Sequence, residues 1–397
     1  MKKYDFVIIG SGIIGLTMAH AIKSRSSSAS ILIVDKEPQE AQHASGRNSG
    51  VLHAGFYYSA DSLKAKFTVE GNRAMKAYVR ARGLKMNECG KLVVAQNEHE
   101  LDQLQELFRR GKRNGSNVSL IDEAHARELE PNVKTFKQAL YSPDTASVDP
   151  KEVCQAIKED LIKQGVLFAY DTKYLGHKNS VIITSRGEME AGKFINCAGL
   201  YADNIAHDYN FGLKYTMIPF KGLYLKYTKN KTDVKMNIYP VPNLKNPFLG
   251  VHYTKTVGGD IKIGPTAIPA FWREHYDSSS ALNVPELAEV LFFESKLFLK
   301  DSFGFRQLAF EEMRKYNKDY FVSLATAMVQ SIDPNGFTEW TKPGIRAQLL
   351  DKEKLSLVQD FAVEGDNRSV HVLNAVSPAF TCAFVFSQYV TEHYIYI

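Results

Sequence analysis

The sequence predicts an α/β protein, α+β overall, with a Rossmann-like nucleotide-binding domain and an inserted mixed β-sheet domain. An apolar strand, a glycine-rich turn and an amphipathic helix follow one another in residues 4–23. A second apolar run, ILIVDK at 31–36, completes a βαβ unit. The 397 residues leave room for roughly two to three domains.

The composition is that of a globular protein. Hydrophobic residues make up 44% and charged residues 23%, which excludes a disordered or fibrous chain. The net charge is +5, from 49 basic and 44 acidic residues, and it does not single out nucleic acid as a partner. The four cysteines form no CxxC pair, so we expect no metal site and a reducing compartment. They are Cys89, Cys154, Cys197 and Cys382.

The sequences of the two ends of the chain indicate where in the cell the protein is expected. The apolar run near Met1 passes directly into glycines, and no stretch of about 18 apolar residues follows. We therefore expect a cytoplasmic protein. The aromatic closing segment, FVFSQYVTEHYIYI, is expected to pack as a final helix. A peripheral contact with the inner face of the cell membrane is the alternative.

Helices and strands are expected to alternate through the first half of the chain. Capping by Asp149 and Pro150 predicts a helix that ends at Gly165. Further helices are expected at 13–23, 60–82 and 98–114, and strands at 6–9, 90–96, 166–177, 181–185 and 192–199. Residues 216–335 read as strand-rich and irregular, with several prolines. We expect one discontinuous nucleotide-binding domain at 1–85, 145–215 and 340–397, and a substrate-binding domain at 86–144 and 216–339.

The motif GSGIIG indicates a dinucleotide site. Gly10 permits a tight turn, Gly12 allows the backbone to approach a pyrophosphate, and Gly15 allows close packing of helix on strand. The amino terminus of the helix offers N–H groups to the phosphates. Asp35, at the end of the second strand, can accept hydrogen bonds from ribose hydroxyls. FAD and NAD share this pattern.

Two further segments suit a cofactor. ASGRNSGVLHAGFYY at 44–58 combines small, polar and aromatic residues that suit phosphate and an isoalloxazine ring, although many enzymes have such a catalytic loop. INCAGLYAD at 195–203 is a buried strand that runs into a turn of small residues.

The chain resembles the FAD-dependent oxidoreductases of the D-amino-acid oxidase type, and within them the L-2-hydroxyglutarate oxidase or dehydrogenase group. The resemblance rests on GSGIIG, RNSGVLHAGFYY, GKLVVA, INCAGLYAD, IPFKGLYL, IYPVPNLKNPFLGVHYT, IKIGPTAIPAFWRE, KPGIRAQL and HVLNAVSPAFTCAF. It implies FAD as the cofactor. With the glycine-rich motif, it implies FAD contacts at Gly10, Gly12, Ile13, Ile14, Gly15, Asp35, Lys36, Ser45, Arg47, Asn48, Ser49, Gly50, Ala198, Gly199, Gly344, Ser377, Pro378 and Ala379.

The chain departs from this group at a few positions. Lys221 stands where the group usually has Arg, and it is a point charge that cannot grip a carboxylate with a planar fork. Asp35 stands where the group often has Glu. Larger residues replace small ones at Phe380, Cys382, Phe384 and Phe386.

Two histidines are the candidates for proton removal, because imidazole exchanges protons near neutral pH. His53 lies in the expected flavin-facing loop and is the first candidate, and His252 is the second. For each, a packing or strand-supporting role is the alternative.

Oxidation of an acid also needs cations that hold carboxylates. Arg346, in GIRAQ, is the first candidate, followed by Lys221 and Arg273, with Tyr57 and Tyr253 as hydroxyl donors. For each, a structural role is the alternative.

We therefore hypothesise that FAD accepts a hydride from L-2-hydroxyglutarate or a close 2-hydroxy acid, which becomes the 2-oxo acid. An amine, D-amino-acid or glycine-type oxidase on the same fold is one alternative, and a flavoprotein without turnover is another. The electron acceptor is expected to be oxygen, a quinone or an electron-transfer protein.

Overall fold

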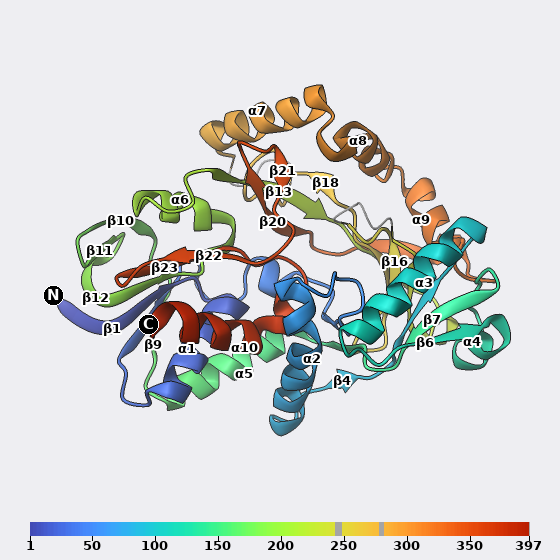
Figure 1. Ribbon diagram of the computed structural model, residues 1–397, viewed down its shortest axis with the longest axis horizontal. Helices are drawn as coiled ribbons and strands as arrows, with labels where there is room; N and C mark the ends of the chain where they lie inside the picture. The colour runs from blue at the N-terminus through green and yellow to red at the C-terminus, as the bar shows by residue number, and fades with distance from the viewer. Residues whose placement is uncertain (243–247, 278–281, 397) are drawn as a thin grey trace.

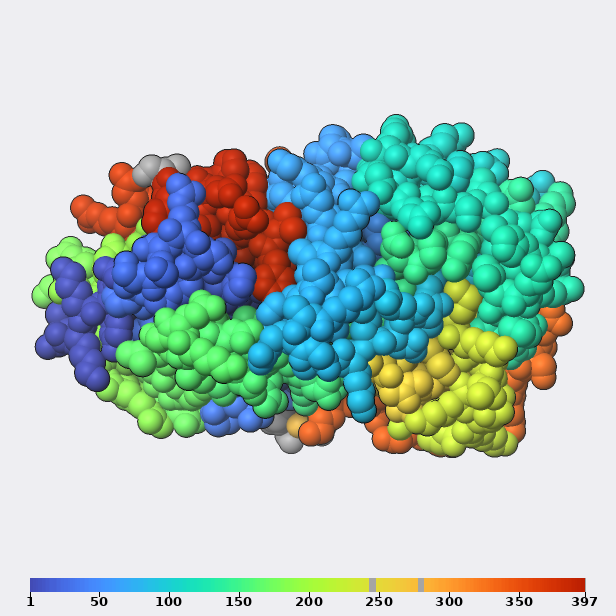
Figure 2. All heavy atoms as spheres, turned by 90° about the horizontal axis from the view of Figure 1, so that it is seen from below, coloured from blue at the N-terminus to red at the C-terminus, as the bar shows by residue number. Residues whose placement is uncertain are grey.

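The computed structural model describes residues 1–242, 248–277 and 282–396. The molecule is elongated, with both chain ends at one end and the helices α3 and α4 at the other (Figure 1). Seen from below, residues near 60–90 lie between the region that holds both chain ends and the region formed by the middle of the chain (Figure 2). Part of the predicted proline-rich segment, 243–247, lies outside the described residues.

The first sheet is built on the predicted βαβ unit. Its central strand β1 (Lys2–Ile9) pairs in parallel with β2 (Ile31–Val34) and with β12 (Gly187–Asn196). Helices cover both faces of a parallel sheet, so side chains on both sides of the strand are buried. This explains the continuous apolar run from Phe6 to Ile9. The sheet continues through β9 (Leu167–Ala169), β10 (Tyr174–Lys178), β11 (Val181–Thr184), β22 (Ala362–Gly365) and β23 (Ser369–Asn374).

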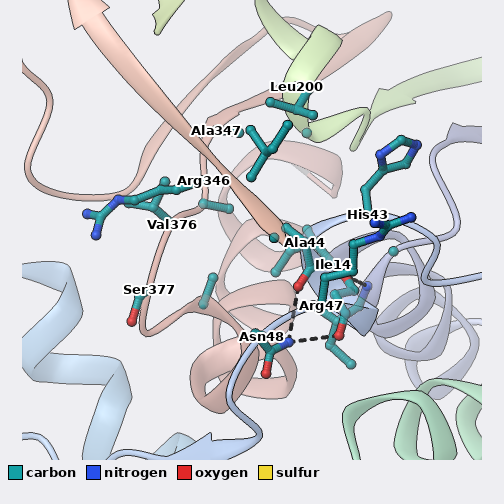
Figure 3. Close-up of a pocket in the computed structure, with 18 of the residues that line it drawn as sticks. Ile14, His43, Ala44, Arg47, Asn48, Leu200, Arg346, Ala347, Val376 and Ser377 are labelled. Carbon is teal, nitrogen blue, oxygen red and sulfur yellow. Dashed lines mark hydrogen bonds between the residues drawn. The ribbon is translucent and has the colours of Figure 1, made fainter. Parts of the chain in front are cut away.

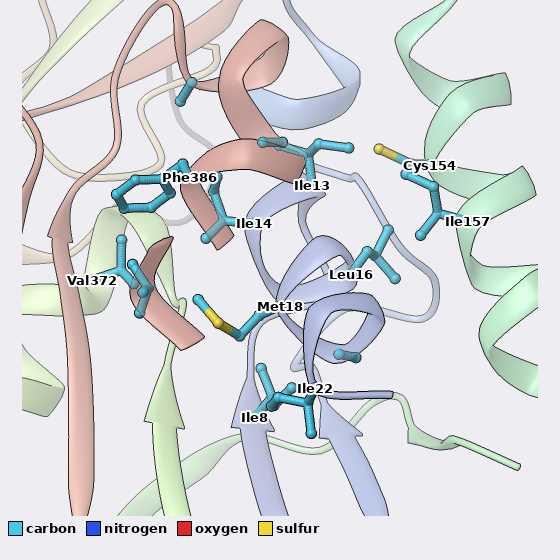
Figure 4. Packing of buried hydrophobic residues seen from close by; sticks show 14 of the residues in the cluster. Ile8, Ile13, Ile14, Leu16, Met18, Ile22, Cys154, Ile157, Val372 and Phe386 are labelled. Atoms are coloured by element: carbon cyan, nitrogen blue, oxygen red, sulfur yellow. The ribbon is translucent and has the colours of Figure 1, made fainter. Parts of the chain in front are cut away.

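Three helices from distant parts of the sequence cover one face of this sheet (Figure 1). They are α1 (Ile13–Arg25), α5 (Pro150–Lys163) and α10 (Ala379–Val390). Ile8, Met18 and Phe386 meet in the core between them (Figure 4). Helix α2 (Leu63–Ala81) packs against α10, and α6 (Ala202–Asp208) lies on the other face. The carboxyl-terminal helix is thereby brought against the first helix.

A second sheet of eight strands forms the other half of the molecule. Its order is β19 (Phe337–Trp340), β14 (Leu225–Tyr227), β17 (Ile261–Gly264), β16 (His252–Lys255), β15 (Asn237–Pro240), β5 (Lys91–Val94), β7 (Gln138–Ser142) and β6 (Ser119–Asp122). It is accompanied by α3 (Glu98–Arg113), α4 (Glu123–Leu129) and α9 (Lys318–Thr326).

Two smaller sheets join these halves. One consists of β18 (Ile268–Pro269), β13 (Tyr215–Gly222), β20 (Gly344–Asp351) and β21 (Ser356–Leu357), with α7 (Val284–Lys300) and α8 (Phe305–Arg314) nearby. The other consists of β3 (Val51–Leu52), β8 (Ala146–Val148) and β4 (Met86–Asn87). The domain boundaries proposed from the sequence stay a prediction.

The predicted α/β class is confirmed, as is the helix capped by Asp149, whose side chain accepts from the N–H groups of Lys151 and Glu152. The strand-rich prediction is wrong between 284 and 326, where α7, α8 and α9 lie. Asn283, which accepts from the N–H of Glu286, and Pro285 mark the start of α7.

The closing segment packs as a final helix, which is the first of the two interpretations of its sequence. Phe386 and Val390 on α10 are fully buried, and Ile395 is almost so. Among the described residues, no helix has both the length and the apolar character needed to cross a bilayer.

Candidate active site

A cavity of about 940 Å³ lies where the sheets and the amino ends of α1 and α10 meet. Its volume is at the upper end of the range for ligand pockets, roughly 300–1,000 Å³. Arg346 and Ser377 lie toward one side of the pocket and His43 toward the other (Figure 3). Segments from both halves of the molecule therefore line this one cavity.

The glycine-rich turn forms one wall of this cavity. Gly10 has φ +104°, and a Cβ there would lie 2.4 Å from the carbonyl oxygen of Cys197. A Cβ on Gly15 would lie 1.9 Å from the carbonyl oxygen of Gly10, so the helix could not pack on the strand. Gly12 is the N-cap of α1 and provides no side-chain cap. The turn thus leaves the cavity open at the positive end of the helix.

Asp35 borders the same end of the cavity. Its Oδ2 accepts from the N–H of Ser11 at 2.7 Å and from its hydroxyl at 2.6 Å, and its Oδ1 accepts from the N–H of Glu37 at 3.0 Å. These bonds fix the carboxylate beside the turn, and its remaining lone pairs can accept from a ribose. Lys36, which also lines the cavity, pairs with Glu37 and Glu274.

The loop at 44–50 is held by its own side chains. Asn48 donates to the carbonyl oxygens of Ala44 at 3.1 Å and Ser45 at 2.8 Å (Figure 3). Arg47 Nε donates to the carbonyl oxygen of Gln42 at 2.7 Å. A Cβ on Gly344 would lie 2.4 Å from the carbonyl oxygen of Arg47, so β20 needs glycine where it meets the loop.

The remaining predicted cofactor residues come from the end of β12 and the start of α10. The cavity is lined by Ala198 and Gly199 from the first and by Ser377, Pro378 and Ala379 from the second. Ile13, Ile14, Ser45 and Ser49 also line it. Gly15 and Gly50 lie outside the lining, because Gly15 faces β1 and a Cβ on Gly50 would meet the carbonyl oxygen of Val148.

These features fit a dinucleotide. The phosphate end has a glycine cradle in which side chains would clash, with an acidic group beside it. At the other end, His53 Nδ1 is buried and has no hydrogen-bond partner among the described residues. A bound ligand with polar atoms would satisfy such a group.

His53 and His252 both line the cavity. Burial lowers the pKa of His252 to about 3 and holds that of His53 well below its usual value, and the charge of Lys91 lowers both further. His252 Nδ1 lies 2.9 Å from the carbonyl oxygen of Gly250. Because a carbonyl only accepts, Nδ1 carries the proton and Nε2 keeps a lone pair. Both imidazoles are therefore neutral near pH 7, and each keeps a ring-nitrogen lone pair that can accept a hydrogen bond.

Arg346 also lines the cavity, as predicted for a carboxylate contact. Its Nε donates to Gln348 Oε1 at 3.0 Å, and its guanidinium lies over the ring of Phe248 at 5.2 Å. It forms no ion pair with a carboxylate in the part of the chain that the structure describes. Burial lowers the pKa of Arg346 to about 10, so the group remains charged at neutral pH.

The other predicted substrate residues do not reach the cavity lining. Lys221 pairs with Ile345 across β13 and β20, whereas its neighbours Phe220 and Gly222 line the cavity. Side chains alternate along a strand, so Lys221 points to the opposite face. Tyr57 and Tyr253 are buried in hydrophobic clusters behind the wall.

Arg273 differs most from its predicted role. It is 1% exposed and forms an ion pair with Asp203. It also donates to the carbonyl oxygen of Leu200 and to Asn204. Since Asp203 already neutralises it, Arg273 is a structural cation in this position rather than a carboxylate ligand of the cavity.

Several aromatic residues that line the cavity near His252 are not predicted from the sequence. Tyr224, Tyr239 and Phe248 line the cavity. Tyr239 stacks on His252 with ring centroids 3.6 Å apart. They come from β15 and from connections next to β13 and β16, and no local pattern brings them together.

The fold and the cavity define a dinucleotide site, and comparison with known families gives the class of protein. Residues 5–393 match the family model described as FAD dependent oxidoreductase. The chain belongs to this family of FAD-dependent oxidoreductases, and FAD is its cofactor.

Within that class, the chain is similar to proteins named L-2-hydroxyglutarate dehydrogenase. It is 34% identical to the one from Escherichia coli O17:K52:H18, over 96% of this chain and 90% of that protein. It is also 34% identical to the mitochondrial one from Homo sapiens, over 98% of this chain and 88% of that protein.

Solved structures show the same fold. L-α-glycerophosphate oxidase from Mycoplasma pneumoniae with FAD bound gives a TM-score of 0.75 at 21% identity, over 98% of this chain and 94% of that one. Glycine oxidase from Geobacillus kaustophilus gives 0.70 at 16% identity, over 99% and 94%.

Proposed function

We propose that this enzyme oxidises L-2-hydroxyglutarate, or a close 2-hydroxy acid, to the 2-oxo acid. The relatives named L-2-hydroxyglutarate dehydrogenase support this substrate. The observation that carries the proposal is the combination of a carboxylate-free guanidinium, Arg346, with two neutral histidines in one cavity. A hydroxy acid offers a carboxylate to the first and a hydroxyl proton to the second.

The charge around Arg346 favours an anion. Burial lowers the pKa of Lys64 to about 7, and the like charge of Arg346 contributes to this shift. Asp360 is the acidic group that offsets Lys64. A carboxylate bound at Arg346 would relieve this repulsion, because an opposite charge stabilises both cations.

The residues divide the work of the reaction. FAD, when bound, accepts the hydride equivalent from the substrate carbon. Arg346 holds a carboxylate and so orients that carbon, and the apolar face of Phe248 helps to fix the guanidinium. His53 or His252 accepts the hydroxyl proton. Tyr224 and Tyr239 close the wall around the bound acid.

Anaerobic reduction tests the proposal. The FAD-loaded protein is mixed with L-2-hydroxyglutarate, and we expect loss of the yellow flavin absorbance with formation of one equivalent of 2-oxoglutarate. D-2-hydroxyglutarate is the matched control for stereochemistry. An intact flavin that stays oxidised with the L acid would remove this substrate.

An amine or amino-acid oxidase is the second candidate, because glycine oxidase shares the fold. At 16% identity this likeness concerns the fold alone. The same experiment with glycine, sarcosine and D-alanine separates the two functions. Reduction by an amine but not by a hydroxy acid would establish the oxidase.

For the electron acceptor we propose a membrane quinone. The helices α7 and α8 lie at one edge of the molecule (Figure 1). Large apolar side chains on these helices and on the turn between them are exposed to solvent: Leu291, Phe292, Leu299, Phe303, Phe310 and Met313. The exposed cations Lys296, Lys300, Arg306 and Arg314 lie on the same helices. Apolar side chains with basic neighbours suit the surface of an anionic bilayer.

Two measurements test this part. The protein should sediment with vesicles that contain anionic lipid, and Phe292→Ser with Phe310→Ser should abolish sedimentation while flavin reduction is kept. The reduced enzyme should also pass electrons to a soluble quinone faster than to oxygen. A high yield of hydrogen peroxide with no quinone reduction would assign oxygen instead.

A further inference from the structure

Among the described residues, Lys91 is a buried cation without a counterion. It is the first residue of β5 and is 0% exposed. Its Nζ has neither a hydrogen bond nor an ion pair within the described ranges. Instead it lies 3.8 Å above the ring of Tyr239, 5.3 Å from that of Tyr57 and 5.8 Å from that of Phe56.

Such a position is costly for the fold. Taking an ammonium group out of water disfavours its charged form, and a buried charge is usually paired. Three rings that face one Nζ compensate only in part, since a cation–π contact contributes about 0.5–2 kcal/mol. An apolar side chain of the same length would be the more stable choice, so the position needs a reason other than stability.

The ring of Tyr239 connects Lys91 to the cavity. Its other contact is His252, at a centroid distance of 3.6 Å and an angle of 16° between the rings. Strand pairing fixes this order, because Tyr239 pairs with Val93 on β5, and β15 lies between β5 and β16. Lys91, Tyr239 and His252 therefore form a stack that leads from the sheet interior to the cavity wall.

The charge of Lys91 acts on both cavity histidines. It lowers the pKa of His252 and that of His53, and His252 further lowers that of His53. Burial lowers the pKa of Lys91 itself to about 7, with Cys89 opposing the shift. The titratable groups that face this stack are Cys89, Lys91, His53, His252, Tyr57, Tyr58, Tyr224 and Tyr239.

We propose that Lys91 is a positioning residue of the oxidation site, which acts through Tyr239 to hold His252 in place at the cavity wall. This rests on the proposed function, in which a histidine takes the hydroxyl proton. Because Lys91 lies behind the wall, it touches neither the substrate nor the flavin.

The test compares Lys91→Met with Lys255→Met. Lys255 is a buried lysine of β16, two strands from β5 in the same sheet, and its Nζ donates to the carbonyl oxygen of Lys231. The FAD-loaded proteins are labelled with ¹⁵N-histidine, and the signals are assigned with His252→Gln and His53→Gln. In Lys91→Met we expect the two cavity histidines to titrate at least one pH unit higher than in the unmodified protein, and in Lys255→Met we expect no change.

A second variant separates placement from charge. Tyr239→Leu removes the stack and keeps Lys91, and we expect His252 to populate both neutral tautomers instead of the Nδ1–H form alone. If Lys91→Met does not fold, this variant alone decides the placement. Unchanged histidine titration in a folded Lys91→Met, or an unchanged His252 tautomer in Tyr239→Leu, would overturn the proposal.

Flavin reduction then links the stack to turnover. In Lys91→Met, the rate of reduction by L-2-hydroxyglutarate should fall at least tenfold at every pH from 6 to 8, because His252 is no longer held in the orientation in which it accepts the hydroxyl proton. The histidine signals need no turnover. If the histidine titration shifts in a protein that never oxidises the hydroxy acid, the proposed function is refuted. The effect of Lys91 on the two histidines is then still supported.

Discussion

Arg273 and Asp203 form a buried two-point ion pair, with Nη1–Oδ1 at 2.5 Å and Nη2–Oδ2 at 2.9 Å. Asp203 also accepts from the N–H of Met217, at the start of β13. The pair thus connects α6 of the first sheet, the strand β13 and the segment that leads to α7. Its position explains why a cation expected at the substrate lies within the protein interior.

Breaking this pair should destabilise the fold. Arg273→Met leaves the buried carboxylate of Asp203 without its cation, and we expect the free energy of unfolding to fall by about 3–5 kcal/mol. Urea unfolding of the FAD-loaded protein measures this change. Arg80→Met is the control, because the Arg80–Glu88 pair is about half exposed and such pairs contribute roughly 0–1 kcal/mol. Equal effects of the two substitutions would contradict the assignment.

Gly344 should be needed for FAD binding. Its Cβ would collide with the backbone of Arg47 and push the loop at 44–50 away from β20. We expect Gly344→Ala to weaken FAD binding at least tenfold in a fluorescence titration of the apoprotein. Gly258→Ala is the matched control, since a Cβ there has nothing within 4 Å. Retention of full affinity in Gly344→Ala would show that the loop can move at no cost.

Arg346 should set the preference for acids. A charged hydrogen bond contributes about 1.5–3 kcal/mol, so Arg346→Met should lower kcat/KM for L-2-hydroxyglutarate by roughly one to two powers of ten. Lys221→Met changes a cation that faces away from the cavity, and we expect less than a threefold effect. Steady-state kinetics with a dye acceptor gives both values. The reverse ranking would move the carboxylate contact to Lys221.

The stability of the protein should depend on pH through Lys91. The pKa of this group is about 7 in the fold and near 10.5 when unfolded. Between these values the unfolded chain holds the extra proton, so stability rises with pH, and the cost of the buried charge is full below pH 7. Lys91→Met removes that cost, which is at most about 5 kcal/mol at about 1.4 kcal/mol per pKa unit.

The variant should therefore be more stable than the unmodified protein at pH 6, and the difference should shrink toward pH 10. Urea midpoints across this range measure it. A difference that stays constant with pH would mean that the charge of Lys91 is not lost in the fold.

The local features of the cofactor site could be predicted from the sequence. The turn at Gly10, Gly12 and Gly15 joins a strand to a helix within a dozen residues, so its geometry is a property of the local chain. Asp35 ends the next strand and lies beside it. The resemblance to a family then located Ser377 and Gly344, which are distant in sequence and line the same cavity.

The substrate end could be predicted only in part. Tyr239 and Lys91 meet because β15 inserts beside β5, about 145 residues away, and strand register is not visible in either segment alone. Arg273 was misplaced because a buried partner, Asp203, is distant in sequence. The helices between 284 and 326 were missed although Asn283 and Pro285 are ordinary start signals, because the surrounding prolines suggested irregular structure.

Anaerobic mixing of the FAD-loaded protein with L-2-hydroxyglutarate asks whether the bound flavin takes electrons from this hydroxy acid. We expect the flavin to be fully reduced in a single turnover, 2-oxoglutarate to appear in equal amount, and Arg346→Met to slow this step while the flavin remains bound. A bound flavin that the hydroxy acid leaves oxidised, but that glycine or another amine reduces, would contradict the proposed function.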